Sequence, residues 1–105
     1  MAFKRTRTIR NTDLIVNDGY QKIVNISFLI GNSITFSLQM AKDLNNSNQE
    51  LFIDGFEESV FVRSNDPLWD TYFSDSALRG NGVTLIGNAY LYAKTLDSFS
   101  DAVDV

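Results

Sequence analysis

The chain has 105 residues, of which 44% are apolar and 12% aromatic, so it is long enough for one domain with one hydrophobic core. It contains neither cysteine nor histidine, which excludes disulfide scaffolds, zinc fingers, thiol nucleophiles, Ser-His-Asp triads and histidine pH switches. The formal net charge is -4, yet residues 1–10 carry +4 and the rest of the chain -8. Because an acidic body repels a phosphate backbone, we expect nucleic acid to bind only through the N-terminal segment, if it binds at all.

Residues 1–12 are predicted to form a basic N-terminal arm or an edge strand. In any strand of this segment, Lys4 and Arg10 point to one side and Arg5 and Arg7 to the other, so burying either face costs free energy. We therefore expect these four residues to bind a neighbouring protein subunit or a nucleic acid. The alternative is a frayed terminus.

Two Asp-Gly dipeptides predict hairpin turns. Asp18-Gly19 lies between an apolar segment at 13–17 and a β-rich run at 20–30, and Asp54-Gly55 divides residues 50–63 in the same way. A type I′ turn needs positive φ at both central residues, which Asp-Gly tolerates. The sequence therefore predicts two hairpins of similar local chemistry.

A third turn is predicted at Gly31-Asn32, between the run at 20–30 and a strand over 33–40. Glycine in the first position of a two-residue loop is typical of a type II′ turn. This loop length places Leu29 opposite Ile34.

The strand over residues 20–30 is predicted to be central, because most positions on both of its faces are apolar. Val24, Ile26 and Phe28 share one of these faces in the predicted register. Their cover is expected to be a second sheet, the later helix or a partner subunit. These three residues are the predicted partner-binding sheet face.

The second half of the chain starts with a polar connection at 42–49 and changes its apolar period after the third hairpin. Asp66 is a suitable N-cap, Pro67 suits the first helical position, and Gly80 is a stop signal. Apolar residues between them recur at helical spacing. We predict one helix at about residues 66–79.

The β pattern returns over residues 83–96 and repeats an earlier local sequence. Leu29-Ile30-Gly31-Asn32 is echoed by Leu85-Ile86-Gly87-Asn88, which suggests two similar β units, the second with a helical insertion. The alternative is that β proteins reuse a small number of turn dipeptides.

Together these elements predict a mainly β domain of the α+β class, a small antiparallel β-sandwich or flattened barrel of hairpins with one helix. The single β-rich domain spans residues 13–96. It is preceded by the arm at 1–12 and followed by an acidic C-terminal tail at 97–105.

No constellation of residues points to catalysis. Asp66, Asp70 and Asp75 come nearest to a carboxylate or calcium cluster, but capping and the helix dipole account for the first two, and the spacing fits no calcium loop. Gly80-Asn81-Gly82 follows a helix, whereas a phosphate loop precedes one. We predict no catalytic residue, no metal ligand and no cofactor.

Four aromatic residues allow an alternative function as a small ligand- or carbohydrate-binding β module. Trp69 and Tyr72 lie in the predicted helix, and Tyr90 and Tyr92 point the same way along the last predicted strand. Rings at helical spacing beside Leu68 are more often the face that packs on a sheet.

The leading hypothesis is a non-enzymatic structural subunit that binds neighbouring protein subunits through its basic arm and its apolar sheet face, as a homo-oligomer or in a larger assembly. Phage virion proteins such as capsid cement, tail or connector subunits are one setting for such a chain. The sequence has neither a membrane-spanning apolar stretch nor the apolar region of a secretory signal at its start, so we expect a cytoplasmic or virion location without membrane partners.

Overall fold

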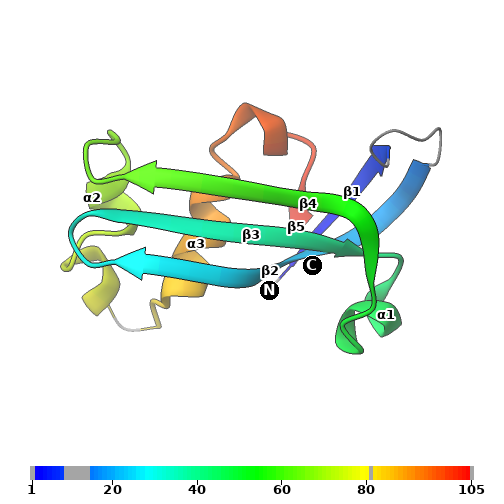
Figure 1. The fold of residues 1–105 in the computed structure, drawn as a ribbon. Coiled ribbons are helices and arrows are strands. Elements are labelled where there is room, and N and C mark those ends of the chain that lie inside the picture. Colours follow the sequence, from blue (N-terminus) through cyan, green and yellow to red (C-terminus); the bar gives the residue numbers. More distant parts are fainter. Residues whose placement is uncertain (1, 9–14, 81, 105) are drawn as a thin grey trace.

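The computed structural model describes residues 2–8, 15–80 and 82–104. Within them the chain forms an antiparallel sheet in the strand order β4-β3-β2-β1-β5. Figure 1 shows this sheet with β4, β3 and β2 side by side in front. The strands are β1 (Phe3–Thr8), β2 (Ile15–Leu29), β3 (Ser33–Ala41), β4 (Phe52–Arg63) and β5 (Val103–Asp104).

Short helices form the second layer. Behind the sheet in Figure 1 lie α2, α3 and the C-terminal helical turn, whereas α1 lies at the end where β3 leads into β4. The predicted class, a mainly antiparallel β domain with helical structure, is confirmed, but helices rather than a second sheet cover the core. None of the helices in the described part of the chain is long and apolar enough to cross a membrane. The helical elements are α1 (Leu44–Asn48), α2 (Trp69–Tyr72), α3 (Leu85–Ala93) and the 3-10 turns η1 (Ala77–Arg79) and η2 (Asp97–Phe99).

The hydrophobic core lies between one face of the sheet and the helical layer. Alternation in β3 sets its position, because every second residue of this strand points to the same face. Ile34, Phe36, Leu38 and Met40 are each 0% exposed, whereas the residues between them are half-buried. The helical layer contributes Trp69, Phe73, Ala89, Tyr90, Tyr92, Ala93 and Phe99.

The β2–β3 hairpin has a three-residue loop instead of the predicted two-residue loop. Gly31 adopts a φ of 71°, and Ile30 is 84% exposed at the tip. Ile34 therefore pairs with Phe28, not with Leu29. A one-residue shift exchanges the two faces of a strand relative to its neighbour, so the predicted register was wrong.

Both Asp-Gly dipeptides lie inside strands, so the hairpin turns predicted there are wrong. β2 continues through Asp18-Gly19 and β4 through Asp54-Gly55. In β2, Asp18 lies in a bulge opposite β1, with a φ of 50° and its N–H donating to Oγ1 of Thr6 at 3.1 Å, whereas Gly19 pairs with Arg5. Asp and Gly tolerate a positive φ, and this property led to the predicted turn. In the structure the same property allows Asp18 to adopt the backbone conformation of a bulge.

The predicted polar connection at 42–49 contains a short helix. Oδ1 of Asp43 accepts a hydrogen bond from the backbone N–H of Asn46 at 2.8 Å, so Asp43 is the N-cap of α1. The helix ends at Asn48, and Gln49 is its C-cap.

The predicted helix at 66–79 is interrupted in the structure. Its segment contains α2 and η1, separated by a turn around Ser74. The hydroxyl of Ser74 donates to the carbonyl oxygen of Asp70 at 2.8 Å and accepts from the N–H of Ala77 at 3.2 Å. A serine hydroxyl that bonds to nearby backbone groups competes with the backbone hydrogen bonds of a helix. The hydroxyl of Ser74 forms such bonds where the helix is interrupted.

Residues 83–96 do not form the predicted strand, because they contain the helix α3. Thr84 has an extended backbone and its Oγ1 accepts from the N–H of Gly87 at 2.9 Å, which satisfies the start of the helix. Ala89 and Ala93 are 0% exposed and belong to the hydrophobic core. The sequence echo therefore belongs to a hairpin turn in its first copy and to a helix in its second, so it is not a structural duplication.

Candidate functional site

The predicted N-terminal arm is part of the sheet where the structure describes it. β1 pairs with β2 and, at Phe3 and Lys4, also with β5. Phe3 is 0% exposed, and its ring lies 5.1 Å from the ring of Tyr90. The Lys4 ammonium lies 5.6 Å from the ring centroid of Tyr20, the residue opposite it in β2. Arg10 lies outside the described residues, and only the backbone of Arg7 is described.

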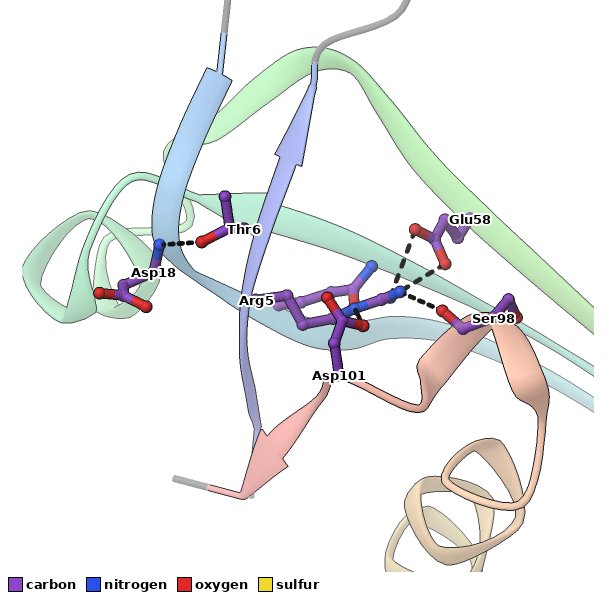
Figure 2. A network of polar contacts seen from close by, with 7 residues as sticks. Arg5, Thr6, Asp18, Glu58, Ser98 and Asp101 are labelled. Carbon is purple, nitrogen blue, oxygen red and sulfur yellow. Dashed lines mark hydrogen bonds and ion pairs between the residues drawn. The ribbon is translucent and has the colours of Figure 1, made fainter.

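Arg5 is buried at a junction of three segments that are far apart in the sequence (Figure 2). Its Nη1 donates to Oε1 of Gln21 at 2.7 Å and to Oε2 of Glu58 at 3.1 Å. Its Nη2 donates to the carbonyl oxygen of Ser98 at 2.5 Å, and its Nε lies 3.5 Å from Oδ1 of Asp101. Arg5 thus connects β1 with β2, β4 and the C-terminal segment.

This network accounts for the burial of a charged side chain. Arg5 is 2% exposed, and a guanidinium at that depth needs opposite charges and hydrogen-bond acceptors. Glu58 and Asp101 supply the charges, and the guanidinium carbon also lies 4.2 Å from the ring centroid of Phe99. The expectation that Arg5 contacts a partner at the surface is therefore contradicted, because Arg5 is buried and its Nη1 and Nη2 donate to groups of the same chain.

The residues predicted as a partner-binding sheet face do not share one exposed surface. Val24 is the extra residue of a β-bulge in β2 and is 39% exposed. Ile26 and Phe28 point to the helical layer, where the ring centroid of Phe28 lies 6.2 Å from that of Trp69. Of the three covers considered for this face, the later helical segment of the same chain is the one observed.

Three of the four residues of the predicted ligand platform are buried in the core. Trp69 is 4% exposed, Tyr90 2% and Tyr92 5%, while Tyr72 is half-buried. Tyr90 and Tyr92 lie in α3 instead of a strand. The hydroxyl of Tyr90 accepts the backbone N–H of Ile23 at 2.7 Å, and burial raises the pKa of Tyr90. Stacking on a sugar needs open ring faces, so the structure favours the core role for these rings.

The three aspartates considered for a site lie in different environments. Asp66 accepts the N–H of Leu68 at 2.8 Å and the hydroxyl of Tyr92 at 3.0 Å. Burial and this hydrogen bond to Asp66 together raise the pKa of Tyr92 to about 12. Asp75 forms an exposed ion pair with Arg79 at 2.6 Å. In the described ranges no group of three potential metal-binding side chains occurs.

The face of the sheet opposite the helical layer carries an apolar patch that sequence reasoning missed. We define the tip patch as Leu29, Ile30 and Phe61, which are 59%, 84% and 56% exposed. Leu29 and Phe61 point to the same open face near the same end of the sheet, and Ile30 lies in the hairpin loop beside them. The signal was present in the sequence, because Phe61 alternates with the core residues Val60 and Val62.

A cavity of about 370 Å³ opens on the helical-layer side of the hairpin loop, where Ile30 is the one residue that it shares with the tip patch. It lies between the hairpin loop and the segment that contains α2 and η1. Aromatic and aliphatic side chains dominate its wall, so it has room for an apolar side chain. The lining residues are Phe28, Ile30, Gly31, Trp69, Phe73, Ser74, Asp75 and Leu78.

Comparison of the chain with protein-family models, with curated proteins and with solved structures finds no match. The candidate site therefore rests on its geometry, which combines an open sheet face, an exposed apolar tip and a free sheet edge formed by β4 within the described residues.

Proposed function

We propose that this protein is a non-enzymatic structural subunit that binds neighbouring protein subunits through the tip patch and the adjoining edge strand β4. The observation that carries the proposal is the exposure of Leu29, Ile30 and Phe61 at one end of a sheet whose other face is already covered. These residues replace the arm and the sheet face expected from the sequence as the contact surface.

The physical support for this surface is its apolar character on a well-supported scaffold. Each large apolar side chain contributes about 1.5–3 kcal/mol when it is transferred from water into a fully buried contact. Because the strands behind the patch belong to a continuous ladder, binding costs little ordering of the backbone.

The proposed setting is an assembly built from repeated small chains, of which a phage virion is the example suggested by the sequence. Capsid cement, tail and connector subunits are roles of this type. In each of them one folded chain contacts other protein subunits and performs no catalysis, which is the division of labour proposed here.

The test is the mass of the folded protein in solution, measured by light scattering over a wide range of protein concentration. We expect the mass to rise with concentration for the natural chain. The substitutions Leu29→Ser and Phe61→Ser, made together, are expected to weaken this association by about tenfold or more, because they remove the exposed apolar groups. Ile86→Ser with Leu91→Ser is the matched control, since both residues are exposed on α3 in the helical layer.

A chain that stays monomeric at every concentration would contradict self-assembly through this surface, and so would equal effects of the two pairs of substitutions. Deleting residues 1–10 is not a usable test of a surface arm. That deletion also removes Phe3 and Arg5, which are buried parts of the fold.

A further inference from the structure

We infer that the neighbour bound at β4 is a second copy of this chain, joined edge to edge in an antiparallel ladder that is centred on Val60. The inference rests on the proposed function and names the partner and the register of that contact. Three features of β4 support it: backbone groups that point away from β3, a regular stretch of pairing with β3, and opposite charges at the two ends of that stretch.

The outer edge of β4 presents unpaired backbone groups. Within the described strands β4 pairs with β3 alone. The N–H of Ser64 donates to the carbonyl oxygen of Asn32 at 2.8 Å, so these two residues form a hydrogen-bonded pair. Hydrogen-bonded and non-hydrogen-bonded pairs alternate along the antiparallel β3–β4 ladder from this point. Residues whose backbone groups bond to β3 therefore alternate with residues whose groups point away. The second set consists of Glu57, Ser59, Phe61 and Arg63.

The regular part of β4 is bounded on both sides. Its pairing with β3 is unbroken from Glu57, opposite Gln39, to Arg63, opposite Ser33, and the register shifts on the far side of Glu57. The midpoint of this segment is Val60. A twofold axis at Val60 therefore uses all of the straight edge and none of the irregular part, and closed twofold contacts are the commonest in homo-oligomers.

This register brings opposite charges together. With Val60 at the axis, Glu57 of each copy lies opposite Arg63 of the other, so the interface contains this pair twice. In one chain these two residues are six positions apart along a strand, or about 20 Å, which is too far for an ion pair. Their partners in β3 are the uncharged residues Gln39 and Ser33. Glu57 and Arg63 can therefore form an ion pair with each other only between two chains.

The same register covers the exposed aromatic residue of β4. Phe61 of one copy lies opposite Ser59 of the other and diagonal to the second Phe61. Aromatic side chains are long enough to touch across such a diagonal. Moving the axis to Ser59 or to Phe61 takes Glu57 out of register with Arg63. The charges therefore select the centre at Val60, and this centre also brings the two Phe61 rings within reach of each other.

A charge-reversal cycle tests this contact. We expect Glu57→Arg alone and Arg63→Glu alone each to weaken self-association, measured by sedimentation, by about tenfold or more, because each places like charges opposite each other twice. The double variant restores both pairs with their signs exchanged, so its affinity is expected to return towards that of the natural chain. Glu50→Arg and Lys42→Glu are matched controls at exposed positions outside the edge, with the same changes in net charge.

Disulfide trapping tests the register, since the natural chain has no cysteine. Ser59→Cys in one copy and Phe61→Cys in the other lie opposite each other, with a Cα–Cα distance of about 5.5 Å that suits a disulfide. We expect mild oxidation to link a mixture of the two variants, but to link neither variant alone to a comparable extent.

The outcomes separate the two proposals. Self-association that responds to the tip patch but not to the charge cycle leaves the proposed function standing and overturns the β4 pairing. Trapping of Phe61→Cys with itself, in preference to the mixture, overturns the centre at Val60. A monomeric natural chain contradicts both proposals. Binding of β4 to a different protein, with no self-association, refutes the second copy as the partner.

Discussion

At the scale of single residues, the burial of Arg5 makes the N-terminal segment part of the fold. A basic residue in a charged segment is expected at the surface, yet Arg5 points into the protein, where it contacts Gln21 and Glu58. Gly19 pairs with Arg5 across the ladder and is buried. A Cβ atom at position 19 would lie 2.5 Å from Sδ of Met40, so glycine makes this close packing possible.

The first prediction concerns the stability that Arg5 provides. We expect Arg5→Met to lower the free energy of unfolding by about 1–3 kcal/mol. Gln21 and the carbonyl group of Ser98 lose a donor, and the part-exposed Glu58 and Asp101 lose their shared counter-charge. Adding Glu58→Gln to that variant should recover part of the loss, since one of the two uncompensated carboxylates is then neutral. Urea unfolding of the natural chain and the two variants measures these differences. Lys4→Met, on the same strand, is the control and is expected to change stability by less than about 1 kcal/mol.

The second prediction concerns the pH dependence that Tyr92 creates. The folded chain holds the pKa of Tyr92 at about 12, above its ordinary value of 10.0. Between these two values the unfolded chain has already lost the proton that the folded chain retains. The free energy of unfolding should therefore fall as the pH rises from 10.0 to 12, and this contribution is constant below that window.

Tyr92→Phe removes this titration, so its stability should fall less steeply in the same window of pH. Some dependence is expected to remain, because burial also raises the pKa of Tyr90. Urea unfolding at a series of alkaline pH values, with tyrosinate absorbance as a second readout, measures the effect. An unchanged slope in Tyr92→Phe would show that the pair formed by Tyr92 and Asp66 does not contribute.

At the scale of elements, one tetrapeptide adopts two structures. Leu-Ile-Gly-Asn at 29–32 closes a hairpin, with Gly31 at a φ of 71°, whereas at 85–88 it is the first turn of α3. The residues that flank the two copies differ. A long β-rich run precedes the first copy, and Thr84 caps the second. The apolar pattern of four residues fits both periods, so it does not select between helix and strand.

The third prediction follows from this cap. Thr84→Ala is expected to destabilise the protein by about 1 kcal/mol, because the N–H of Gly87 loses its acceptor at the start of α3. Thr84→Ser keeps a hydroxyl in the same place and should lie close to the natural chain. Thermal unfolding followed by circular dichroism measures both. If the two variants are equally stable, the hydroxyl at position 84 does not hold this helix.

Strand register is also decided at this scale. The dipeptide Gly31-Asn32 is compatible with loops of two or three residues, and the structure contains the longer loop. The choice places Ile34 opposite Phe28 on the core face and leaves Leu29 on the open face. The exposure of Leu29 in the tip patch follows from the one extra residue in this loop, since a two-residue loop would pair Leu29 with the buried Ile34.

At the scale of the whole molecule, part of the charge asymmetry of the sequence is resolved inside the chain. The basic first ten residues and the acidic remainder suggest attraction to a neighbour. For Arg5 the attracting carboxylates are Glu58 of β4 and Asp101 of the C-terminal segment (Figure 2). Another carboxylate of that segment, Asp104, pairs with Lys94 at 2.9 Å. The C-terminal residues therefore pack against the domain instead of forming the separate acidic tail that their composition suggests.

The sequence by itself determined the class of the fold and the central strand pattern. The alternation of apolar and polar residues over 33–40 and the long β-rich run before it are local properties of the sequence. They therefore predict the strands β2 and β3 without information about the rest of the chain. It also identified Trp69 as a core residue at helical spacing.

Only the tertiary structure decided the register of the first hairpin, the helical state of residues 85–93 and the burial of Arg5. Each of these depends on contacts between segments far apart in the chain. The guanidinium is buried because residues from β2, β4 and the C-terminal segment converge on it. The helix α3 buries Ala89, Tyr90 and Ala93 in a core that distant segments complete. Local patterns carry no information about such convergence, so they predicted a basic arm or an edge strand but not the internal ion pairs of Arg5.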